Sequence, residues 1–534
     1  MTAARPPGVE DFPDLLRLRG PDGPCGLFSD CGSWLAVTWG ERALLELHDT
    51  LDNRVHLLDL GAPARLRTVW ADRLEASLAS GAETAAAFAG DGLLVIDYRH
   101  GRPPAPSCDL PFSVERTGEG SWRIQVGEGL EPPPPDLFAR RRRAWNERFA
   151  RAFASFRGGG ARDRLLLARA IATLLWNRRA PRRGLPDAGI IPSPFAYRGF
   201  WAWDSWKHAH ALARIDPALG LAQLRAQFFG EDEDGMVPDT VMPDPAANNH
   251  RNTKPPLAAW ALDELRRAGA AAAEVAPLRR RCAGQLRWWS LHRRARGEAF
   301  YRYGGVDGGT AAWDSGWDDS ARFAGARLDP HGKWRLFALH CPDLHAYLHQ
   351  EFAAMARLYG AAGLERGAWE ERAGRTARLL GRLWDPERGA FCDHDPQGRS
   401  TGVLSAACWL PVWSGAAQPR QAESVRRLVL DPRHFGTPVP FPSLAASEPA
   451  FDPDGYWNGG VWLDHAAWAL AVLGEEGAAA RERLLAAVAA LPSFYECLSP
   501  LTGRPCAGAR PAVAQFSWSA AAVVEILTTH PSRR

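Results

Sequence analysis

The feature that most constrains the fold is a change of hydrophobic periodicity near residue 138. From about residue 20 to 128, short apolar runs such as SWLAVTW, RVHLLDL and GLLVIDYR alternate with turn residues, a pattern typical of β-strands. The segment LEPPPPDLF (130–138) follows, and its consecutive prolines exclude a helix and favour a stiff extended connector. Beyond it, apolar residues recur every three or four positions, which indicates amphipathic helices.

About twelve helical segments follow without intervening strands. They fall near 155–178, 201–214, 218–229, 254–268, 271–294, 341–361, 363–384, 401–412, 418–430, 459–474, 476–492 and 516–530. Six antiparallel pairs would close into a barrel of inner and outer helices around a cavity. We therefore expect a mainly α protein: an N-terminal β-rich, sandwich-like domain (1–130), a linker (131–150) and an (α/α)6 barrel catalytic domain (151–534).

Charge and cysteine usage exclude several classes of protein. The 534 residues carry a formal net charge of only +3, with basic and acidic residues interspersed, so neither nucleic acid nor a membrane surface is indicated as a partner. The N-terminus lacks the apolar core of a signal peptide, and no run of about 18 apolar residues occurs. The nine cysteines are scattered without CxxC spacing, so we expect reduced thiols and no zinc site. A cytoplasmic enzyme is expected, with its oligomeric state left open.

The segment WDSGWDDSARF (313–323) is the first candidate site. Three carboxylates alternate there with two tryptophans around a glycine: Asp314, Asp318, Asp319, Trp313, Trp317 and Gly316. Tryptophan faces can stack on a sugar ring, and they desolvate a neighbouring carboxyl, which favours its protonated form. The alternative is a loop anchored by tryptophan, in which the aspartates cap the next helix.

A second candidate, YRGFWAWDSWKHAHAL (197–212), is an aromatic entry into a helix. Phe200 and Trp203 precede Asp204, which could cap the helix or accept hydrogen bonds from sugar hydroxyls beside a binding wall. His208 and His210 face different sides of a helix, so they do not form a metal pair. They are expected to be core histidines.

Three further segments lie near the C-terminus. FDPDGYWNGGVWLDHAAWAL (451–470) carries Tyr456, Trp457 and Asn458, FYECLSPLTGRP (494–505) carries Glu496, and QFSWSAAAVVEIL (515–527) carries Trp518. Glycoside hydrolysis needs two carboxyl groups, one to protonate the leaving oxygen and one to act as base or nucleophile. Spacing alone does not pair Asp318 with Glu496.

At these segments the chain resembles glycoside hydrolase family 63 and its relatives, the family 37 trehalases and the mannosylglycerate hydrolases. The resemblance covers roughly residues 150–530 and implies an (α/α)6 barrel with inverting chemistry. The family carries its general acid in E-S-G-x-D-N-S, and WDSGWDDSARF has Asp318 at that position. Asp314 stands where the family has Glu, and Asp319 where it usually has Asn.

Other segments carry the resemblance further. FYECLSPLTG matches the family segment that holds the base, which assigns that role to Glu496. YWNGGVW (456–462) resembles Y-W-R-G-P-x-W with Asn458 and Gly460 in place of Arg and Pro, so substrate identity does not carry over. In NNHRNTKPPLAAWAL (248–262), Lys254 stands where Gln often precedes the proline pair, and its charge favours an anionic aglycone such as glycerate.

We therefore expect an inverting, α-glucosidase-like α-glycosidase that hydrolyses an α-linked glucoside or short oligosaccharide, with Asp318 as general acid and Glu496 as general base. The expected substrate-binding residues are Phe200, Trp203, Asp204, Lys254, Trp313, Asp314, Gly316, Trp317, Tyr456, Trp457, Asn458 and Trp518. The alternatives are a mannosylglycerate or glucosylglycerate hydrolase, a trehalase, a sugar epimerase, or a carbohydrate-binding protein without activity. No cofactor or metal is expected, since the acidic run GEDEDGMVPD (230–239) lacks EF-hand spacing.

Overall fold

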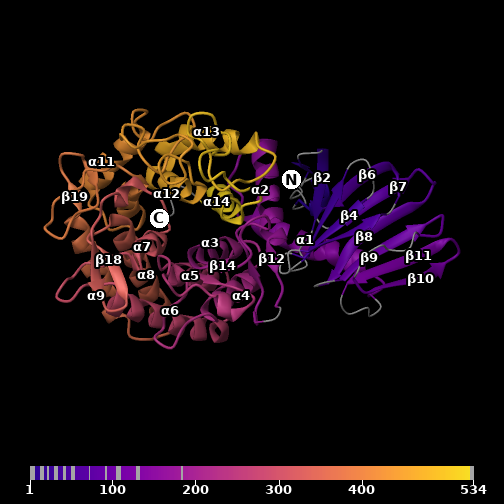
Figure 1. Ribbon diagram of the computed structural model, residues 1–534, viewed down its shortest axis with the longest axis horizontal. Helices are drawn as coiled ribbons and strands as arrows, with labels where there is room; N and C mark the ends of the chain where they lie inside the picture. Colours follow the sequence, from indigo (N-terminus) through magenta and orange to yellow (C-terminus); the bar gives the residue numbers. More distant parts are fainter. Residues whose placement is uncertain are drawn as a thin grey trace, which may run out of the picture.

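A β-rich part and a helical part lie side by side in the chain (Figure 1). The computed structural model describes residues 7–12, 17–20, 23–28, 34–39, 44–49, 54–59, 61–70, 73–90, 93–103, 110–127, 133–181 and 184–529. One antiparallel sheet runs in the order β1-β2-β3-β4-β5, with strands Arg17–Gly20, Gly23–Phe28, Trp34–Trp39, Leu44–Asp49 and Arg54–Asp59. The other runs β10-β11-β9-β8-β7-β6, with β6 to β11 at Pro63–Trp70, Arg73–Leu78, Glu83–Gly90, Leu93–Arg99, Phe112–Gly118 and Ser121–Gly127.

The two sheets share one apolar core. Leu47 of β4 and Leu58 of β5 are buried in the same cluster as Leu74 of β7 and Ile96 of β9. Along β7 every second residue is buried, which is the signature of a strand with one face toward a core. The expectation of an N-terminal β-rich part is consistent with this packing.

The remainder of the chain is predominantly helical. Its helices α1 to α14 span Leu137–Ala154, Gly160–Trp176, Ala202–Leu212, Pro217–Phe228, Ala258–Arg267, Ala272–His292, Gly308–Ser315, Pro342–Ala361, Gly367–Gly381, Leu410–Trp413, Pro419–Leu430, Leu463–Leu473, Ala478–Ala489 and Ser517–Thr528. Each predicted helical segment overlaps one of them, but in 401–412 only the end is helical: the short α10 and the 3-10 turn Ala406–Trp409 before it. Two were not predicted: α1, and α7, which lies between the predicted segments 271–294 and 341–361.

Helix α1 occupies most of the segment expected to be a linker (131–150). The segment from Leu137 to Ala154 is helical, so an extended chain does not connect the two parts over the whole of 131–150. The buried face of α1 presents Trp145, Phe149 and Phe153, and Phe12 near the N-terminus packs against the two phenylalanines. The last proline of the run, Pro135, precedes the helix, so the prolines restrict only the backbone that leads into α1.

Among the described residues, six helices pack in a closed ring around the cavity described below. Each contacts the next in the order α3, α5, α8, α10, α12, α14, and α14 returns to α3. A second layer lies outside the ring: α2 packs on α14, α4 on α3, α6 on α5, α9 on α8, and α11 on α12 (Figure 1). Interior positions such as those of α14 are buried on every side, as a helix between two helical layers requires.

Short strand pairs fix the loops between the helices. Strand β12 (Arg178–Arg179) pairs with β13 (Gly189–Ile190), β14 (Phe200–Trp201) with β15 (Thr240–Val241), and β19 (Trp384–Asp385) with β20 (Ala390–Phe391). A sheet in the order β16-β18-β17 uses Gly304–Gly305, Trp334–Phe337 and Leu328–His331. The strands of these pairs lie in segments that lead from an outer helix to the next helix of the ring.

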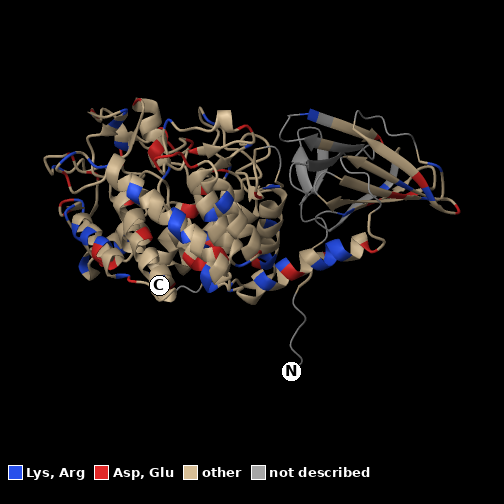
Figure 2. Cartoon of the chain, turned by 90° about the horizontal axis from the view of Figure 1, so that it is seen from below, with Lys and Arg blue, Asp and Glu red and all other residues tan. Residues whose placement is uncertain are grey.

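Charges of both signs are interspersed over the helical part in Figure 2, in agreement with the sequence pattern. Within the described ranges, no helix is both long and apolar enough to cross a lipid bilayer. Six of the nine cysteines are described as free and buried thiols: Cys282, Cys341, Cys392, Cys408, Cys497 and Cys506.

Packing between α2 and the ring can be tested with two leucines of α2. Leu167 is fully buried, whereas Leu165 is 43% exposed. We expect Leu167→Ala to lower the free energy of unfolding by about 2–5 kcal/mol, because it removes buried methyl groups and leaves a cavity. Leu165→Ala is the matched control and should change it by less than about 0.5 kcal/mol. Urea denaturation measures both, and equal losses would contradict this packing.

Candidate active site

A cavity of about 520 Å³ opens where the inner helices α3 and α14 begin. Its walls combine aromatic rings with charged groups, and most of them belong to the loops and helix starts singled out in the sequence. The lining residues are Pro192, Tyr197, Trp201, Trp203, Asp204, Asp239, Thr240, Asn249, Lys254, Trp313, Gly316, Asp318, Tyr456, Trp457, Trp462, Glu496, Arg510, Pro511, Phe516 and Trp518.

Glu496 is a buried carboxylate held by two phenols. Its Oε1 accepts hydrogen bonds from the hydroxyl groups of Tyr456 (2.5 Å) and Tyr197 (2.9 Å). Burial raises the pKa of Glu496, while the two phenolic donors oppose this rise. The carboxyl therefore has a fixed orientation, and its charge interacts with that of Asp318 in the same cavity.

Asp318 lies between two cations. Its Oδ2 is 3.1 Å from Nη1 of Arg510, and its Oδ1 is 3.8 Å from Nζ of Lys254. From the sequence, Trp313 and Trp317 are predicted to desolvate this carboxyl. Trp313 does line the cavity, but Trp317 is fully buried and stacks on Trp457 with ring centroids 4.8 Å apart. Cationic side chains thus take the place expected for one aromatic wall.

The apolar wall of the cavity is built from tryptophans of separate segments. Trp203 in the first turn of α3 meets Trp518 in the first turn of α14, with ring centroids 4.9 Å apart. Nζ of Lys207 lies 3.4 Å from the ring centroid of Trp203 and 3.5 Å from that of Trp518, and it pairs with Asp464 at 2.7 Å. The rings are therefore fixed from behind by a buried ion pair.

The backbone conformation and the close approach of Trp203 require a glycine at position 316. Its φ of 79° is in the left-handed region, and a Cβ there would lie 2.3 Å from Cζ2 of Trp203. The absence of a side chain lets the loop that carries Asp318 approach the aromatic wall.

Two further carboxyl groups face the cavity. Burial raises the pKa of Asp204 to about 7 and that of Asp239 to about 6, although the nearby lysines favour the carboxylate forms. The backbone NH of Ala202 donates to the carbonyl oxygen of Asp239 at 2.8 Å, and β14 pairs with β15 beside it. These contacts bring two acidic groups, distant in sequence, to one wall.

Four residues expected to bind substrate do not line this cavity. Phe200 is buried in a small apolar cluster with Leu185 and Val241, and Trp317 is buried behind Trp457. Asn458 connects two loops, since its amide donates to the carbonyl oxygen of Asp319 and its Oδ1 accepts from the NH of Ala321. Each of these side chains positions residues that do face the cavity.

Asp314 is the fourth, and it is fully buried. Its carboxylate pairs with Arg293 at 3.0 Å and accepts hydrogen bonds from the backbone NH groups of Thr253 (2.9 Å) and Gly304 (3.0 Å). Because Lys254 follows Thr253, Asp314 fixes the segment that carries this lysine. Its carboxylate is fully used by these contacts and is structural.

Sequence reasoning missed several lining residues, among them Tyr197, Asp239, Asn249 and Arg510. Asp239 ends the acidic run GEDEDGMVPD (230–239), yet it is buried and accepts a hydrogen bond from Asn249 at 3.0 Å. The apolar residues that precede it in the sequence, Met236 to Pro238, could have indicated that this end of the run is buried. For Arg510, in a segment without periodicity, no local signal existed.

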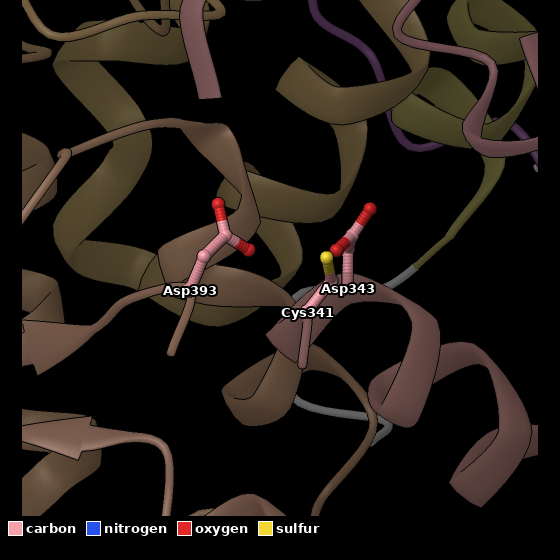
Figure 3. A group of neighbouring side chains, drawn as sticks. All are labelled: Cys341, Asp343 and Asp393. Atoms are coloured by element: carbon pink, nitrogen blue, oxygen red, sulfur yellow. The ribbon is translucent and has the colours of Figure 1, made fainter. Parts of the chain in front are cut away.

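One cluster of potential metal ligands lies apart from the cavity lining. Cys341, Asp343 and Asp393 offer ligand atoms within 4.8 Å of one another (Figure 3). However, Arg322 Nη2 lies 2.7 Å from both carboxylates, and burial raises the pKa of the Cys341 thiol well above its ordinary value. Because a guanidinium already neutralises the acids and the thiol stays protonated, these residues do not fit a metal ion.

Comparison with known proteins identifies the class. The chain is 25% identical over 422 residues to a mannosylglycerate hydrolase of Rubrobacter radiotolerans, an alignment that covers 63% of this chain and 92% of that protein. The fold is similar to that of a GH63 mannosylglycerate hydrolase from Thermus thermophilus solved with Tris and D-glycerate: the TM-score is 0.56 at 20% identity, over 67% of this chain and 99% of that one. Neutral trehalase Nth1 from Saccharomyces cerevisiae gives a TM-score of 0.51 at 14% identity, over 64% and 73% of the two chains.

A helical fold shared with these enzymes, around a cavity that combines carboxyl groups with tryptophan faces, defines a glycoside hydrolase. The model of the mannosylglycerate hydrolase MGH1-like glycoside hydrolase domain matches residues 197–519, and the chain belongs to this family. The resemblance to family 63 found in the sequence motifs is thereby confirmed.

The Arg322 cluster supports the loop that carries Asp318, and its stability can be measured. We expect Arg322→Ala to lower the free energy of unfolding by about 3–5 kcal/mol, because two buried carboxylates lose their counterion. Arg399→Ala is the matched control: this arginine also pairs with an aspartate, but its side chain is 78% exposed, so the loss should stay below about 1 kcal/mol. Denaturation in urea compares the two, and equal effects would contradict the assigned role.

Proposed function

We propose that the protein is an inverting α-glycosidase that releases an anionic aglycone, with mannosylglycerate as the substrate of first choice. The observation that carries this proposal is the composition of the cavity: two carboxyl groups, Asp318 and Glu496, with Lys254 and Arg510 beside Asp318. Inverting hydrolysis needs such a pair on opposite faces of the scissile bond, and cations at the acid would receive a negatively charged leaving group.

Asp318 would act as the general acid that protonates the glycosidic oxygen. Glu496 would act as the general base that takes a proton from water on the opposite face of the sugar. The phenolic hydrogen bonds to Oε1 hold the base in place, and Oε2, which accepts one long hydrogen bond from the NH of Val513 (3.4 Å), has a lone pair left to accept the proton. For this chemistry we expect the two carboxyl groups to lie about 6.5–9.5 Å apart, which leaves room for the water.

The sugar would lie against the tryptophan wall. Trp203 and Trp518 offer aromatic faces for stacking, while Asp204 and Asp239 are placed to bind hydroxyl groups. Because their raised pKa values lie near neutrality, these two carboxyls can donate as well as accept hydrogen bonds.

The glycerate assignment replaces an α-glucosidase as the leading hypothesis. The family assignment and the Rubrobacter relative, which is named a mannosylglycerate hydrolase, support it. Trehalase is the second candidate, supported by the shared fold of the yeast enzyme. Trehalose carries no charge, so Lys254 and Arg510 favour the glycerate substrate over it.

The same proposal covers the architecture. We infer an (α/α)6 barrel from the closed ring of helices and its outer layer, with a domain boundary in the segment before α1.

The reaction would need no cofactor, since proton transfer by two carboxyls and a water suffices. The reduced cysteines of the described residues suit the cytoplasm that the sequence predicts.

A substrate panel followed by NMR tests the proposed reaction. With mannosylglycerate, glucosylglycerate and trehalose, we expect the highest kcat/KM for a glycerate glycoside. The sugar should be released first as the β-anomer before mutarotation, because attack by water inverts the anomeric carbon. An initial α-anomer would mean retention and would remove the role of Glu496 as base; trehalose as the best substrate would favour the second candidate.

The proposed roles of Asp318 and Glu496 can be distinguished by how the loss of turnover in each variant depends on the leaving group. Asp318→Asn should lower turnover of a glycerate or alkyl glycoside by about 10²–10⁴-fold and that of an activated aryl glycoside much less, because only a poor leaving group needs the proton. Glu496→Gln should damage both substrate types, since water must be activated in each case.

Asp319→Asn is the matched control for these variants. Asp319 accepts a hydrogen bond from the NH of Trp457 at 3.0 Å, and an amide oxygen can accept the same bond. The charge of Asp319 also interacts with that of Asp318, so both rates can fall, but the dependence on the leaving group should stay far below that of Asp318→Asn. If Asp319→Asn shows the larger leaving-group dependence, the acid has been assigned to the wrong aspartate.

A further inference from the structure

Different partners hold the two carboxyl groups of the proposed reaction. Asp318 contacts two cationic side chains, at 3.1 and 3.8 Å. Glu496 instead accepts hydrogen bonds on Oε1 from the phenols of Tyr456 (2.5 Å) and Tyr197 (2.9 Å), and it forms no ion pair with a cation of the described residues. The proposed base is thus held by neutral donors, although cations line the same cavity.

Aromatic neighbours hold both phenols in place. The ring of Tyr197 packs edge-on against Trp201 and Phe516, with centroids 5.1 and 5.9 Å apart. The ring of Tyr456 packs edge-on against Trp462, 4.8 Å away, and the indole NH of Trp462 donates to the carbonyl oxygen of Tyr456 at 2.8 Å. The two hydroxyl groups therefore converge on one carboxylate oxygen from segments that are distant in sequence.

The surroundings of Glu496 meet two opposing demands on a general base, which must be ionised when water attacks and must still bind a proton well. Burial raises the pKa of Glu496, and the charge of Asp318 acts in the same direction. The two phenols and the NH of Val513 oppose this rise. A cation in contact would stabilise the carboxylate more strongly than a neutral donor and would make it a weaker base. Neutral donors therefore suit a buried base.

The phenols themselves stay protonated. Burial raises the pKa of Tyr197 and raises that of Tyr456 well above its ordinary value, and the charge of Glu496 acts in the same direction on both. The thiol of Cys497, the next residue in the chain, is also neutral, because a hydrogen bond with Cys506 and burial raise its pKa well above the ordinary value. These three groups therefore add no charge beside Glu496 at neutral pH.

The charged groups that share the cavity with Glu496 stay the same when a phenol is replaced by phenylalanine. They come from α3, from the loops that precede β15, α5 and α14, and from the loop that follows α7. A change in the titration of Glu496 in such a variant therefore reports the lost hydrogen bond. The charged groups are Asp204, Asp239, Lys254, Asp318 and Arg510.

We propose that Tyr197 and Tyr456 are positioning residues that keep Glu496 ionised and direct its second oxygen, Oε2, to the attacking water. Both phenols occupy Oε1, whereas Oε2 accepts one long hydrogen bond, from the NH of Val513 at 3.4 Å. The proton from water is therefore taken up at Oε2. The inference rests on the proposed function, in which Glu496 is the base, and adds two residues that act through it.

The pH profile of kcat/KM, which reports groups of the free enzyme, tests this role. Tyr456→Phe and Tyr197→Phe each remove one hydrogen bond to the ionised base and keep the aromatic ring. Glu496 then stays protonated up to a higher pH, so the acid limb should rise by about one pH unit in each variant. We expect the larger shift in Tyr456→Phe, whose hydrogen bond is the shorter, and a still larger one in the double variant.

Tyr495→Phe is the matched control. Tyr495 precedes Glu496 in the chain but does not line the cavity, and among the described hydrogen bonds none joins its hydroxyl to Glu496. This variant should keep the acid limb of the unmodified enzyme. A merely structural role of Tyr197 and Tyr456 would lower the rate at every pH, and an acid limb that stays in place in both variants overturns the proposal.

Titration of Glu496 without substrate does not depend on turnover. NMR of isotope-labelled glutamate carboxyl carbons follows each glutamate, and the signal lost in Glu496→Gln belongs to Glu496. Its midpoint should lie at higher pH in Tyr456→Phe and Tyr197→Phe than in the unmodified protein, and it should not move in Tyr495→Phe. Equal midpoints in all of these proteins would contradict the proposed role of the phenols.

Failure of this inference and failure of the proposed function can be told apart. If no glycoside of the panel is hydrolysed but the midpoint of Glu496 moves, the phenols have the proposed effect on the carboxyl and the proposed reaction is wrong. If glycosides are hydrolysed and neither the midpoint nor the acid limb moves, the reaction stands and the role of the phenols is overturned.

Discussion

The buried carboxylate of Asp314 is the interaction on which the geometry of the site depends. It binds the guanidinium of Arg293 at the end of α6 and the backbone NH groups of Thr253 and Gly304. Four segments are thereby joined: the end of α6, the approach to α5 that carries Lys254, the small sheet that contains β16, and α7, whose C-terminal loop carries Asp318. A carboxylate buried so completely is stable only when its oxygens are fully paired, so the cluster allows little variation in where these segments lie.

A second buried charge stabilises the aromatic wall. Lys207 lies between Trp203 and Trp518 and pairs with Asp464, which in turn contacts His465 at 3.0 Å. Burial alone would raise the pKa of Asp464, but His465 and Lys207 lower it to about 2, so it stays ionised. The tryptophans can then present one face to the cavity, because their other face is held by a cation that is itself fixed by a buried carboxylate.

Lys254 and Arg510 both contact the carboxylate of Asp318, but they differ in exposure and in their other contacts. Lys254 is buried, lies 3.6 Å from Asp239 and donates to the carbonyl oxygen of Trp313 at 2.6 Å. Arg510, whose side chain is 49% exposed, lies 3.1 Å from the other oxygen of the same carboxylate.

The sequence by itself determined the helical character of most of the chain, the β-rich N-terminal part and the segments that form the cavity, because hydrophobic periodicity and aromatic clustering are local signals. The sequence motifs also indicated Asp318, Glu496, Trp203 and Trp518 as candidate site residues. Only the tertiary structure decided which neighbours face the cavity: Trp317 and Trp313 lie in one short segment, yet one is buried behind Trp457 and the other lines the wall. Arg510 and Asp239 reach the site through contacts between distant segments, and such contacts leave no trace in local pattern. The charge environment of Asp318 therefore depends on packing, since electrostatic partners are set by distance in space rather than along the chain.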